Sequence, residues 1–451
     1  MNTNEEQTIL REEIIKSLSN DPDSIAEIQY LLEKVNSDQS YYISDLFQGE
    51  QLSVPKWFFI VPLLSLTVCL SIFLGFFNNS YLLILLGLAP VNAAIHFYNK
   101  WNVNKYVYSI PMLLSLNAVA KKIRQLKHFK KLSPSISESI KVIDQIKRRV
   151  AIFKLEIKIE SDLEVIYWFL LELIKITFLL EPLLLFSIVG KLKSRKTEIR
   201  EVFEYVGTVD SILSTIALRQ HVPHYCSPTI TDNSTEIKAI RVFHPLIENC
   251  VENSINTENN SVLLTGSNMS GKTTFIRAIG INVISGLVLN TCFAESFSFP
   301  KGNIHTSIRI SDDISSASSY FFKEVETVKN IIDKAEEGSF NLILIDEIFK
   351  GTNTIERIAA AKAILSYLQD LNCLVFVSTH DIELTEMLGP KYTLYHFKEN
   401  IENDTLTFDY KLKEGVPKEG NAIEILDIEN YPKSLVQEAR SLANQMIKNK
   451  S

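Results

Sequence analysis

Hydrophobic and polar positions follow four different patterns along this chain of 451 residues. Residues 1–54 are acidic and place apolar side chains three and four positions apart, which is the spacing of one helix face. Residues 55–99 hold two apolar runs, and residues 100–235 return to long stretches of helical spacing with few glycines or prolines. Over residues 236–451, short β-branched runs alternate with helical segments. The pattern therefore predicts an all-helical arm before residue 236 and, after it, an α/β domain whose mostly parallel sheet is flanked by helices.

The two apolar runs between Trp57 and Phe97 are each about as long as a membrane-crossing helix, and neither contains a charged residue. A short Asn-Asn-Ser turn separates them, so both flanks of the resulting hairpin would lie on one side of a membrane. Basic residues on those flanks, namely Lys56, Lys100 and Lys105, indicate the cytoplasmic side. We therefore expect a multi-pass protein of the inner, cytoplasmic membrane, anchored through residues 57–97, with its large C-terminal part in the cytoplasm. The alternative is a pair of buried core helices in a soluble protein.

A second apolar stretch, residues 165–189, differs from the hairpin because charged residues interrupt it. These are Glu172, Lys175 and Glu181, which would be costly in lipid. The sequence therefore favours a helix buried in protein over a third membrane span.

Charge and cysteine content narrow the function only slightly. The net charge of −7 gives no general attraction to nucleic acid. A local basic run at residues 121–131 could lie against anionic lipid or nucleic acid, although a solvated helix face explains it equally well. The five cysteines are scattered, without a Cys-x-x-Cys pair or a Cys/His cluster, so neither a zinc site nor a disulfide framework is expected.

The strongest chemical signal is the segment GSNMSGKT, which matches the P-loop pattern GxxxxGK[ST] and lies between an apolar strand and an amphipathic helix. In such a loop, backbone N–H groups at the start of a helix surround the phosphates of a nucleotide, and a lysine adds positive charge. Lys272 supplies that charge here, and the hydroxyl of Thr273 is a predicted magnesium ligand. The predicted ATP-binding residues are Gly266, Ser267, Asn268, Met269, Ser270, Gly271, Lys272, Thr273 and Thr274. The cofactors expected are therefore ATP and Mg²⁺, and the α/β domain is predicted to be a P-loop NTPase.

Two further strand ends complete a predicted ATPase site. The apolar run NLILIDE ends in Asp346 and Glu347, which we interpret as the magnesium-binding carboxylate and the residue that orients the attacking water. The run FVSTH ends in His380, which would lie beside the terminal phosphate and help to position water. By themselves, an acidic strand end is more often a solvated turn and a strand-end histidine is more often structural, so both assignments depend on the P-loop.

The order and style of these motifs resemble the MutS family over roughly the last 215 residues. The resemblance rests on GSNMSGKTT, on DDISSASSYFFKEV, on LILIDEIFKGTNT and on STHDIELT, together with an FHPLIE segment before the P-loop. It implies ATP hydrolysis in composite sites of a homodimer, with Ser319 presented to the nucleotide of the partner and Asn268 lining the phosphate pocket. It also implies that the adenine is held by Val251 and Tyr410.

The sequence departs from MutS repair proteins in its N-terminal part, where 54 residues and an apolar hairpin stand in place of a mismatch-reading domain. The leading hypothesis is accordingly a membrane-anchored, MutS-like ATPase that acts as an ATP-driven conformational switch. The alternative is an ATP-regulated clamp that binds mismatched or branched DNA, supported locally by the basic run. An ATPase subunit of a transporter is disfavoured because the MutS-type motifs are present and a multi-span permease is not expected.

Overall fold

The computed structural model describes residues 5–48, 56–150, 162–183, 192, 194–232, 234–267, 269–308, 320–349, 352–402, 405–417, 422–429 and 431–450. The chain divides into two compact units, a helical unit (Asn4–Ala217) and a C-terminal unit (Leu218–Ser451). The division falls at residues 217 and 218, whereas the sequence pattern predicts one at 235 and 236. The difference has a local cause, because Cys226 exchanges two backbone hydrogen bonds with Cys292 and the strand Thr229–Thr231 pairs with Ser296–Pro300.

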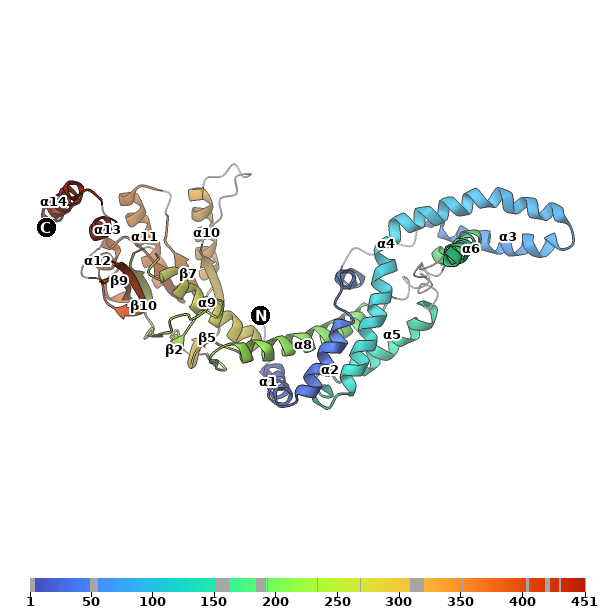
Figure 1. Ribbon diagram of the computed structural model, residues 1–451, viewed down its shortest axis with the longest axis horizontal. Helices are drawn as coiled ribbons and strands as arrows, with labels where there is room; N and C mark the ends of the chain where they lie inside the picture. Colours follow the sequence, from blue (N-terminus) through green and yellow to red (C-terminus); the bar gives the residue numbers. More distant parts are fainter. Residues whose placement is uncertain are drawn as a thin grey trace. The chain divides into compact units, whose positions relative to one another are not determined.

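The helical unit contains the predicted helices and four short 3₁₀ segments (Figure 1). In order they are α1 (Glu5–Ser19), α2 (Pro22–Glu33), η1 (Asp38–Leu46), η2 (Lys56–Phe59), α3 (Ile60–Gly75), η3 (Asn79–Leu82), α4 (Leu83–Gln125), η4 (Lys127–Phe129), α5 (Ile136–Val150), α6 (Asp162–Phe178) and most of α8 (Lys196–His221). The N-terminal segment does not stand apart as the pattern suggested. Leu18 and Ile28 are fully buried in one core with Ile123, Ile143 and Val209, which come from α4, α5 and α8.

Helices α3 and α4 form the predicted hairpin around a tight turn. The side chain of Asn78 accepts a hydrogen bond from the backbone N–H of Ser80. A Cβ atom on Gly75 would lie only 2.6 Å from Cδ2 of Leu82, so a side chain there would obstruct the turn. The second arm does not end at residue 99, because α4 continues without interruption as far as Gln125. One helix therefore runs from the hairpin into the core of the helical unit.

Three helices of the described chain are long and apolar enough to cross a membrane. Two are the hairpin arms, Trp57–Gly75 and Asn79–Tyr98, which are 22% and 11% buried. The third, Lys272–Leu289, is 56% buried and packs inside the C-terminal unit, where its apolar residues contact the sheet. Only the hairpin thus exposes its apolar surface almost entirely.

Helix α6 packs against both hairpin arms and covers part of the stretch 165–189. The sequence predicts that this stretch is a helix buried in protein. In the structure, only the side of the helix that carries Glu172 and Lys175 is buried. Glu172 and Lys175 are nearly enclosed, whereas Phe169 and Leu170 are 60% and 54% exposed.

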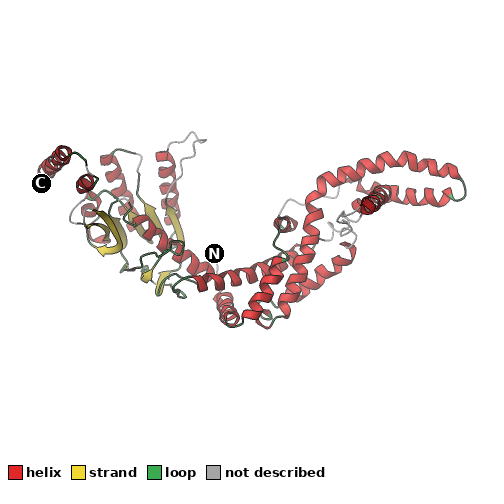
Figure 2. Cartoon of the chain, viewed as in Figure 1, coloured by secondary structure: helices red, strands yellow, loops and turns green. Residues whose placement is uncertain are grey.

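The C-terminal unit contains two sheets (Figure 2). A six-stranded sheet has the order β10 (Thr405–Glu414), β9 (Tyr392–Glu402), β4 (Ser261–Thr265), β8 (Cys373–Ser378), β7 (Asn341–Asp346) and β6 (Asn303–Ser307). All its strand pairs are parallel except β10 with β9, which agrees with the predicted mostly parallel sheet. A four-stranded mixed sheet, not predicted, has the order β1 (Thr229–Thr231), β5 (Ser296–Pro300), β2 (Lys238–Val242) and β3 (Asn253–Asn256).

Alternate residues of the central strands face two separate layers of helices. Val262 and Leu264 pack with Phe275 and Ile279 of α9 (Lys272–Leu289) on one face. Leu263 points to the other face, toward α10 (Tyr320–Ala335) and α11 (Thr354–Gln369). The remaining helices are α12 (Glu383–Met387), η6 (Gly389–Lys391), α13 (Ala422–Ile428) and α14 (Lys433–Lys450). This doubly covered sheet brings the carboxyl ends of β4, β7 and β8 to one edge, which is where ligands bind in open α/β sheets.

Candidate functional site

The loop between β4 and α9 has the backbone geometry of a phosphate cradle. Gly266 and Gly271 have positive φ angles of 141° and 111°, which a side chain would disfavour. A Cβ atom on Gly266 would also lie 2.6 Å from the carbonyl oxygen of Phe397. The two glycines of the motif are thus required by conformation and by close packing, and they lead directly into the N-terminus of an 18-residue helix.

The ammonium of Lys272 lies over this loop. Its Nζ donates hydrogen bonds to the carbonyl oxygens of Gly266, at 2.6 Å, and Ser267, at 2.7 Å. The residue is only 5% exposed, so its charge is held at the mouth of the cradle instead of in bulk solvent. A concave anion site with one fixed positive charge is what nucleotide phosphates require.

Oxygen ligands suited to magnesium meet beside the loop. The hydroxyl of Thr273 lies 2.9 Å from both carboxylate oxygens of Asp346, which ends β7. Ser378, at the end of β8, donates to the same carboxylate at 2.6 Å and holds it in place. A hydroxyl and a carboxylate are hard donors that suit Mg²⁺, which usually takes one or two protein ligands and completes its shell with phosphate and water. No cluster of three or more His, Cys, Asp or Glu side chains that could hold a metal occurs among the described residues.

Glu347 and His380 form an ion pair at the same edge of the sheet. His380 Nε2 lies 2.6 Å from Glu347 Oε1, and the two side chains are 37% and 18% exposed. Glu347 adopts a positive φ of 61°, an unusual conformation for a residue with a side chain, and its N–H donates to the carbonyl of Ser378. The carboxylate is therefore held in one orientation while remaining accessible to water.

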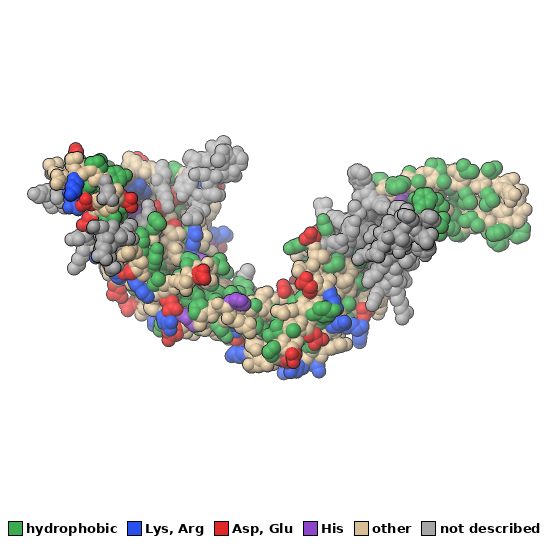
Figure 3. Space-filling view, viewed as in Figure 1, with side chains coloured by type: hydrophobic (Ala, Val, Ile, Leu, Met, Phe, Trp, Pro, Cys, Tyr) green, Lys and Arg blue, Asp and Glu red, His purple; other side chains and the backbone are tan. Residues whose placement is uncertain are grey.

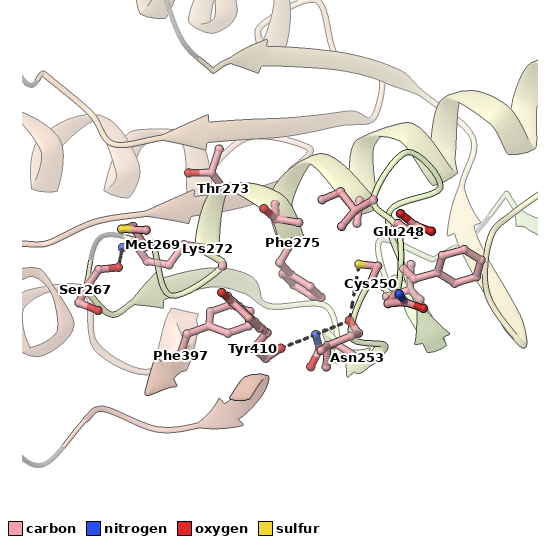
Figure 4. Close-up of a pocket in the computed structure, with 18 of the residues that line it drawn as sticks. Glu248, Cys250, Asn253, Ser267, Met269, Lys272, Thr273, Phe275, Phe397 and Tyr410 are labelled. Carbon is pink, nitrogen blue, oxygen red and sulfur yellow. Dashed lines mark hydrogen bonds between the residues drawn. The ribbon is translucent and has the colours of Figure 1, made fainter. Parts of the chain in front are cut away.

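Many of the predicted residues, although not Gly266, Asp346 or His380, line one cavity of about 610 Å³ (Figure 4). Lys272, Thr273, Thr274 and Glu347 line one part of it, and Val251 and Tyr410 line another. Asn253, which the sequence did not indicate, joins the last two, because its side-chain amide donates to the carbonyl oxygens of Val251 and Tyr410 at 3.3 Å and 3.0 Å. The cavity also includes Ser267 and Met269 of the loop.

Some predicted residues lie elsewhere. Ser270 does not line the cavity but stabilises the loop, since its hydroxyl donates to the carbonyl of Ser267 at 2.9 Å. Asn268 and Ser319 fall outside the described residues, so their predicted contacts with nucleotide remain predictions.

Two supporting contacts were not foreseen. Arg357 of α11 forms a two-pronged ion pair with Asp381, at 2.9 Å and 2.6 Å, next to His380. The hydrogen bonds that Arg357 donates to the Asp381 carboxylate raise the pKa of the guanidinium above its ordinary value. Glu399 of β9, which is 8% exposed, accepts a hydrogen bond from the hydroxyl of Ser267. The only sequence signal for the first contact is that Asp381 directly follows His380, and the second has none.

Comparison with known proteins places this geometry in a family. Residues 262–447 match the family model described as MutS domain V. The chain is 34% identical over 237 residues to the DNA mismatch repair protein MutS of Petrotoga mobilis, covering 50% of this chain and 28% of that protein. It is 30% identical to the proteins of the same name from Fervidobacterium nodosum and Thermotoga maritima, covering 60% of this chain and 33% and 35% of theirs. The match thus spans about a third of the length of these relatives. Residues 262–447, with their P-loop, paired strand-end carboxylates and strand-end histidine, are therefore a MutS-type domain V, and the comparisons support a member of the MutS family.

Proposed function

We propose that the C-terminal unit hydrolyses ATP to ADP and phosphate in the cavity beside the P-loop. The observation that carries this proposal is that Lys272, Thr273 and Glu347 line a single cavity. Asp346 is hydrogen-bonded to Thr273, and His380 contacts Glu347, directly behind that lining. The loop N–H groups and Lys272 would bind the phosphates, and Thr273 and Asp346 would hold Mg²⁺, which neutralises charge on them.

Glu347 is the residue that would orient and polarise the attacking water, with His380 fixing the carboxylate and facing the terminal phosphate. Val251 and Tyr410 would hold the adenine at the other part of the cavity, since they line it together and Asn253 fixes both backbones. The chemistry needs little from the protein beyond position and charge, which fits the rigid, hydrogen-bonded side chains of this site.

The nucleotide site is tested by replacing Lys272 with alanine. Loss of the charge that contacts phosphate should weaken ATP binding by about ten- to a hundredfold, the effect of losing a hydrogen bond to a charged group. Binding of a fluorescent ATP analogue to the full chain in detergent measures this, with Lys301→Ala, an exposed lysine after β5, as the control. Unchanged binding and turnover in Lys272→Ala would refute the site.

We further propose that two copies associate when ATP is bound, as the family resemblance implies. Exposed apolar side chains on elements that flank the site support this, because exposed apolar surface favours protein contact. They are Met269 of the loop, Phe322 of α10 and Ile355 of α11, which are 82%, 61% and 80% exposed. Light scattering should show a dimer with a non-hydrolysable ATP analogue and a monomer without it. A monomer under both conditions would contradict the proposal.

Residues 57–97 are proposed to anchor the protein in the inner membrane with the C-terminal unit in the cytoplasm. Support comes from the charge-free hairpin, whose apolar side chains such as Leu63, Leu66 and Leu86 are 65%, 60% and 76% exposed. Water would make such a surface costly, whereas lipid would cover it. Because α4 continues from the hairpin into the helical unit, ATP-dependent dimerisation could be transmitted along a continuous helix to the membrane or to a partner.

A second candidate function is an ATP-regulated clamp on mismatched or branched DNA. The similarity of this chain to DNA mismatch repair proteins favours this function, and so do the basic residues near the end of α4, of which Lys121 and Lys127 are 56% and 72% exposed. ATP turnover by the full chain should then rise with such DNA and lose this stimulation as salt is added, since phosphate contacts release counterions. Turnover that ignores every DNA would leave the membrane-anchored switch.

A further inference from the structure

The polarity of helix α6 is the reverse of that of a helix in water. Its exposed side chains are apolar: Phe169, Leu170, Leu173 and Ile174 are 60%, 54%, 50% and 49% exposed. Two of its charged side chains point the other way, since Glu172 and Lys175 are only 14% and 15% exposed. A soluble amphipathic helix would turn its charged residues outward and its apolar residues toward the core.

The inward charged side chains contact one another and a histidine of the hairpin. His96 of α4 is fully buried, and its Nε2 lies 3.2 Å from Glu172 while its Nδ1 lies 3.8 Å from Glu181. Lys175 bridges the same two glutamates, at 3.4 Å and 2.9 Å. We call these four residues the polar quartet. Ionisable side chains in apolar surroundings are normally paired in this way, facing the inside of a helix assembly.

The quartet fixes α6 to the hairpin near its base. His96 is close to the end of the apolar run of α4, and Asn92, one turn earlier, donates to the backbone carbonyl of Thr177 at 2.8 Å. Figure 1 draws α6 end-on where it draws α3 and the start of α4 lengthwise, so α6 crosses the hairpin arms. A helix in this position lies where the hairpin would leave the hydrocarbon region.

We propose that α6 is an additional membrane-embedded helix, lying across the base of the hairpin with its apolar face against lipid. The inference rests on the proposed anchoring by residues 57–97. It goes beyond that anchoring because α6 lies more than sixty residues later in the chain and carries Glu172 and Lys175, which would be costly in lipid if they were unpaired. Helices of this kind lie in the interfacial plane with one apolar face among the acyl chains.

Lipid fits this face better than water or a second copy of the chain does. The apolar face of α6 adjoins the exposed apolar surface of the hairpin, which shows no acidic or basic side chain in the space-filling view (Figure 3). Residues 57–97 contain no Asp, Glu, Lys or Arg on any side of the hairpin. An occupant that covers both surfaces must therefore be apolar, as the interior of a bilayer is.

Photocrosslinking in intact membranes tests the proposal on the full chain. A diazirine amino acid is placed singly at the positions of Leu170 in α6, Leu66 in the hairpin and Glu204 in α8, whose side chain is 67% exposed. All three positions are exposed, so the substitutions leave the core intact. Radiolabelled phospholipid attached to the protein after illumination is the readout, and a gel reveals crosslinked dimers.

Lipid labelling at Leu170 comparable with that at Leu66, and several times that at Glu204, is the expected result. Labelling at Leu66 but not at Leu170 would overturn the assignment of α6 and leave the hairpin anchor intact. Labelling at neither position would overturn both. A crosslinked dimer in place of lipid labelling at Leu170 would show that a second copy covers this face, and would likewise overturn the proposal.

Discussion

Each unit of the protein contains a histidine paired with a glutamate, and the two pairs have different surroundings. In the C-terminal unit, His380 and Glu347 lie 2.6 Å apart at an open sheet edge, with side chains 37% and 18% exposed. In the helical unit, His96 and Glu172 lie 3.2 Å apart with side chains 0% and 14% exposed. Glu347 of the first pair lines a cavity of about 610 Å³, whereas the second pair is largely enclosed between α4 and α6. The same residue types are therefore proposed to serve catalysis in one place and helix attachment in the other.

The comparison extends to the whole polarity of the two units. In the C-terminal unit, apolar residues fill two layers around the sheet, and the functional polar groups gather at one edge. Around the hairpin, charged groups lie inside and apolar groups outside. A single rule explains both arrangements, since a polar group is stable wherever it is paired or hydrated and an apolar group wherever water is absent. The exposure of a side chain therefore does not by itself distinguish a functional site from the rest of the molecular surface.

The largest expected effect separates the two histidine–glutamate pairs by function. Glu347→Gln should slow ATP hydrolysis by about a hundred- to ten-thousandfold, the usual contribution of a positioned base, while leaving nucleotide binding intact. Glu172→Gln should leave the turnover number unchanged. Phosphate release and binding of labelled ATP measure both quantities. Normal turnover in Glu347→Gln would remove the catalytic role of this residue.

The next effect concerns the stability of the polar quartet. Lys175→Met should destabilise the helical unit by about 3 kcal/mol, because it leaves two glutamates close together without their shared cation, as in other broken buried pairs. Thermal unfolding in detergent micelles, followed by circular dichroism, measures the change. Replacing Lys175, Glu172 and Glu181 together by apolar residues should restore much of the loss. A single variant as stable as the wild type would show that the quartet does not hold α6.

A smaller effect is expected at the support of the ATPase site. Arg357→Ala should cost about 1.5–3 kcal/mol of stability in the C-terminal unit, because Asp381 loses its charged hydrogen-bond partner. It should also lower turnover by misplacing His380, which precedes Asp381. Chemical denaturation and steady-state kinetics test the two parts, with Lys362→Ala on the same helix as the control. Intact turnover would limit Arg357 to a structural role.

The smallest effect is expected at an exposed ion pair of the helical unit. Lys121 and Asp144 lie 2.9 Å apart, but their side chains are 56% and 34% exposed. Lys121→Ala should therefore change stability by less than about 1 kcal/mol, as is usual for surface pairs. A loss of stability as large as that expected for Lys175→Met would mean that solvent exposure does not explain why the Lys121 pair and the Lys175 contacts differ in strength.

The sequence by itself was sufficient to predict those site residues whose positions are set by adjacent residues in the chain. The P-loop glycines, Lys272 and Thr273 are fixed by one turn between a strand and a helix, and Asp346 and His380 follow directly from the ends of apolar strands. The carboxyl ends of parallel strands lie at one edge of a sheet, so these side chains could be predicted to lie close together. The hairpin was equally predictable, because two continuous apolar segments without charged residues are enough to indicate it.

Tertiary structure alone decided the contacts between residues that are far apart in the chain. Glu399 and Ser267 form a hydrogen bond although 132 positions separate them in the sequence, and Asn253 and Tyr410 do so at a separation of 157. No local sequence pattern predicts either contact. The same holds for the stretch 165–189, whose charged residues Glu172, Lys175 and Glu181 argue against lipid. His96, which contacts Glu172, lies 76 positions from it in the sequence. The composition of a segment determines whether it can be buried. Which of its faces is buried depends on the residues that it contacts in the folded chain, because a charged side chain tolerates apolar surroundings only when it is paired.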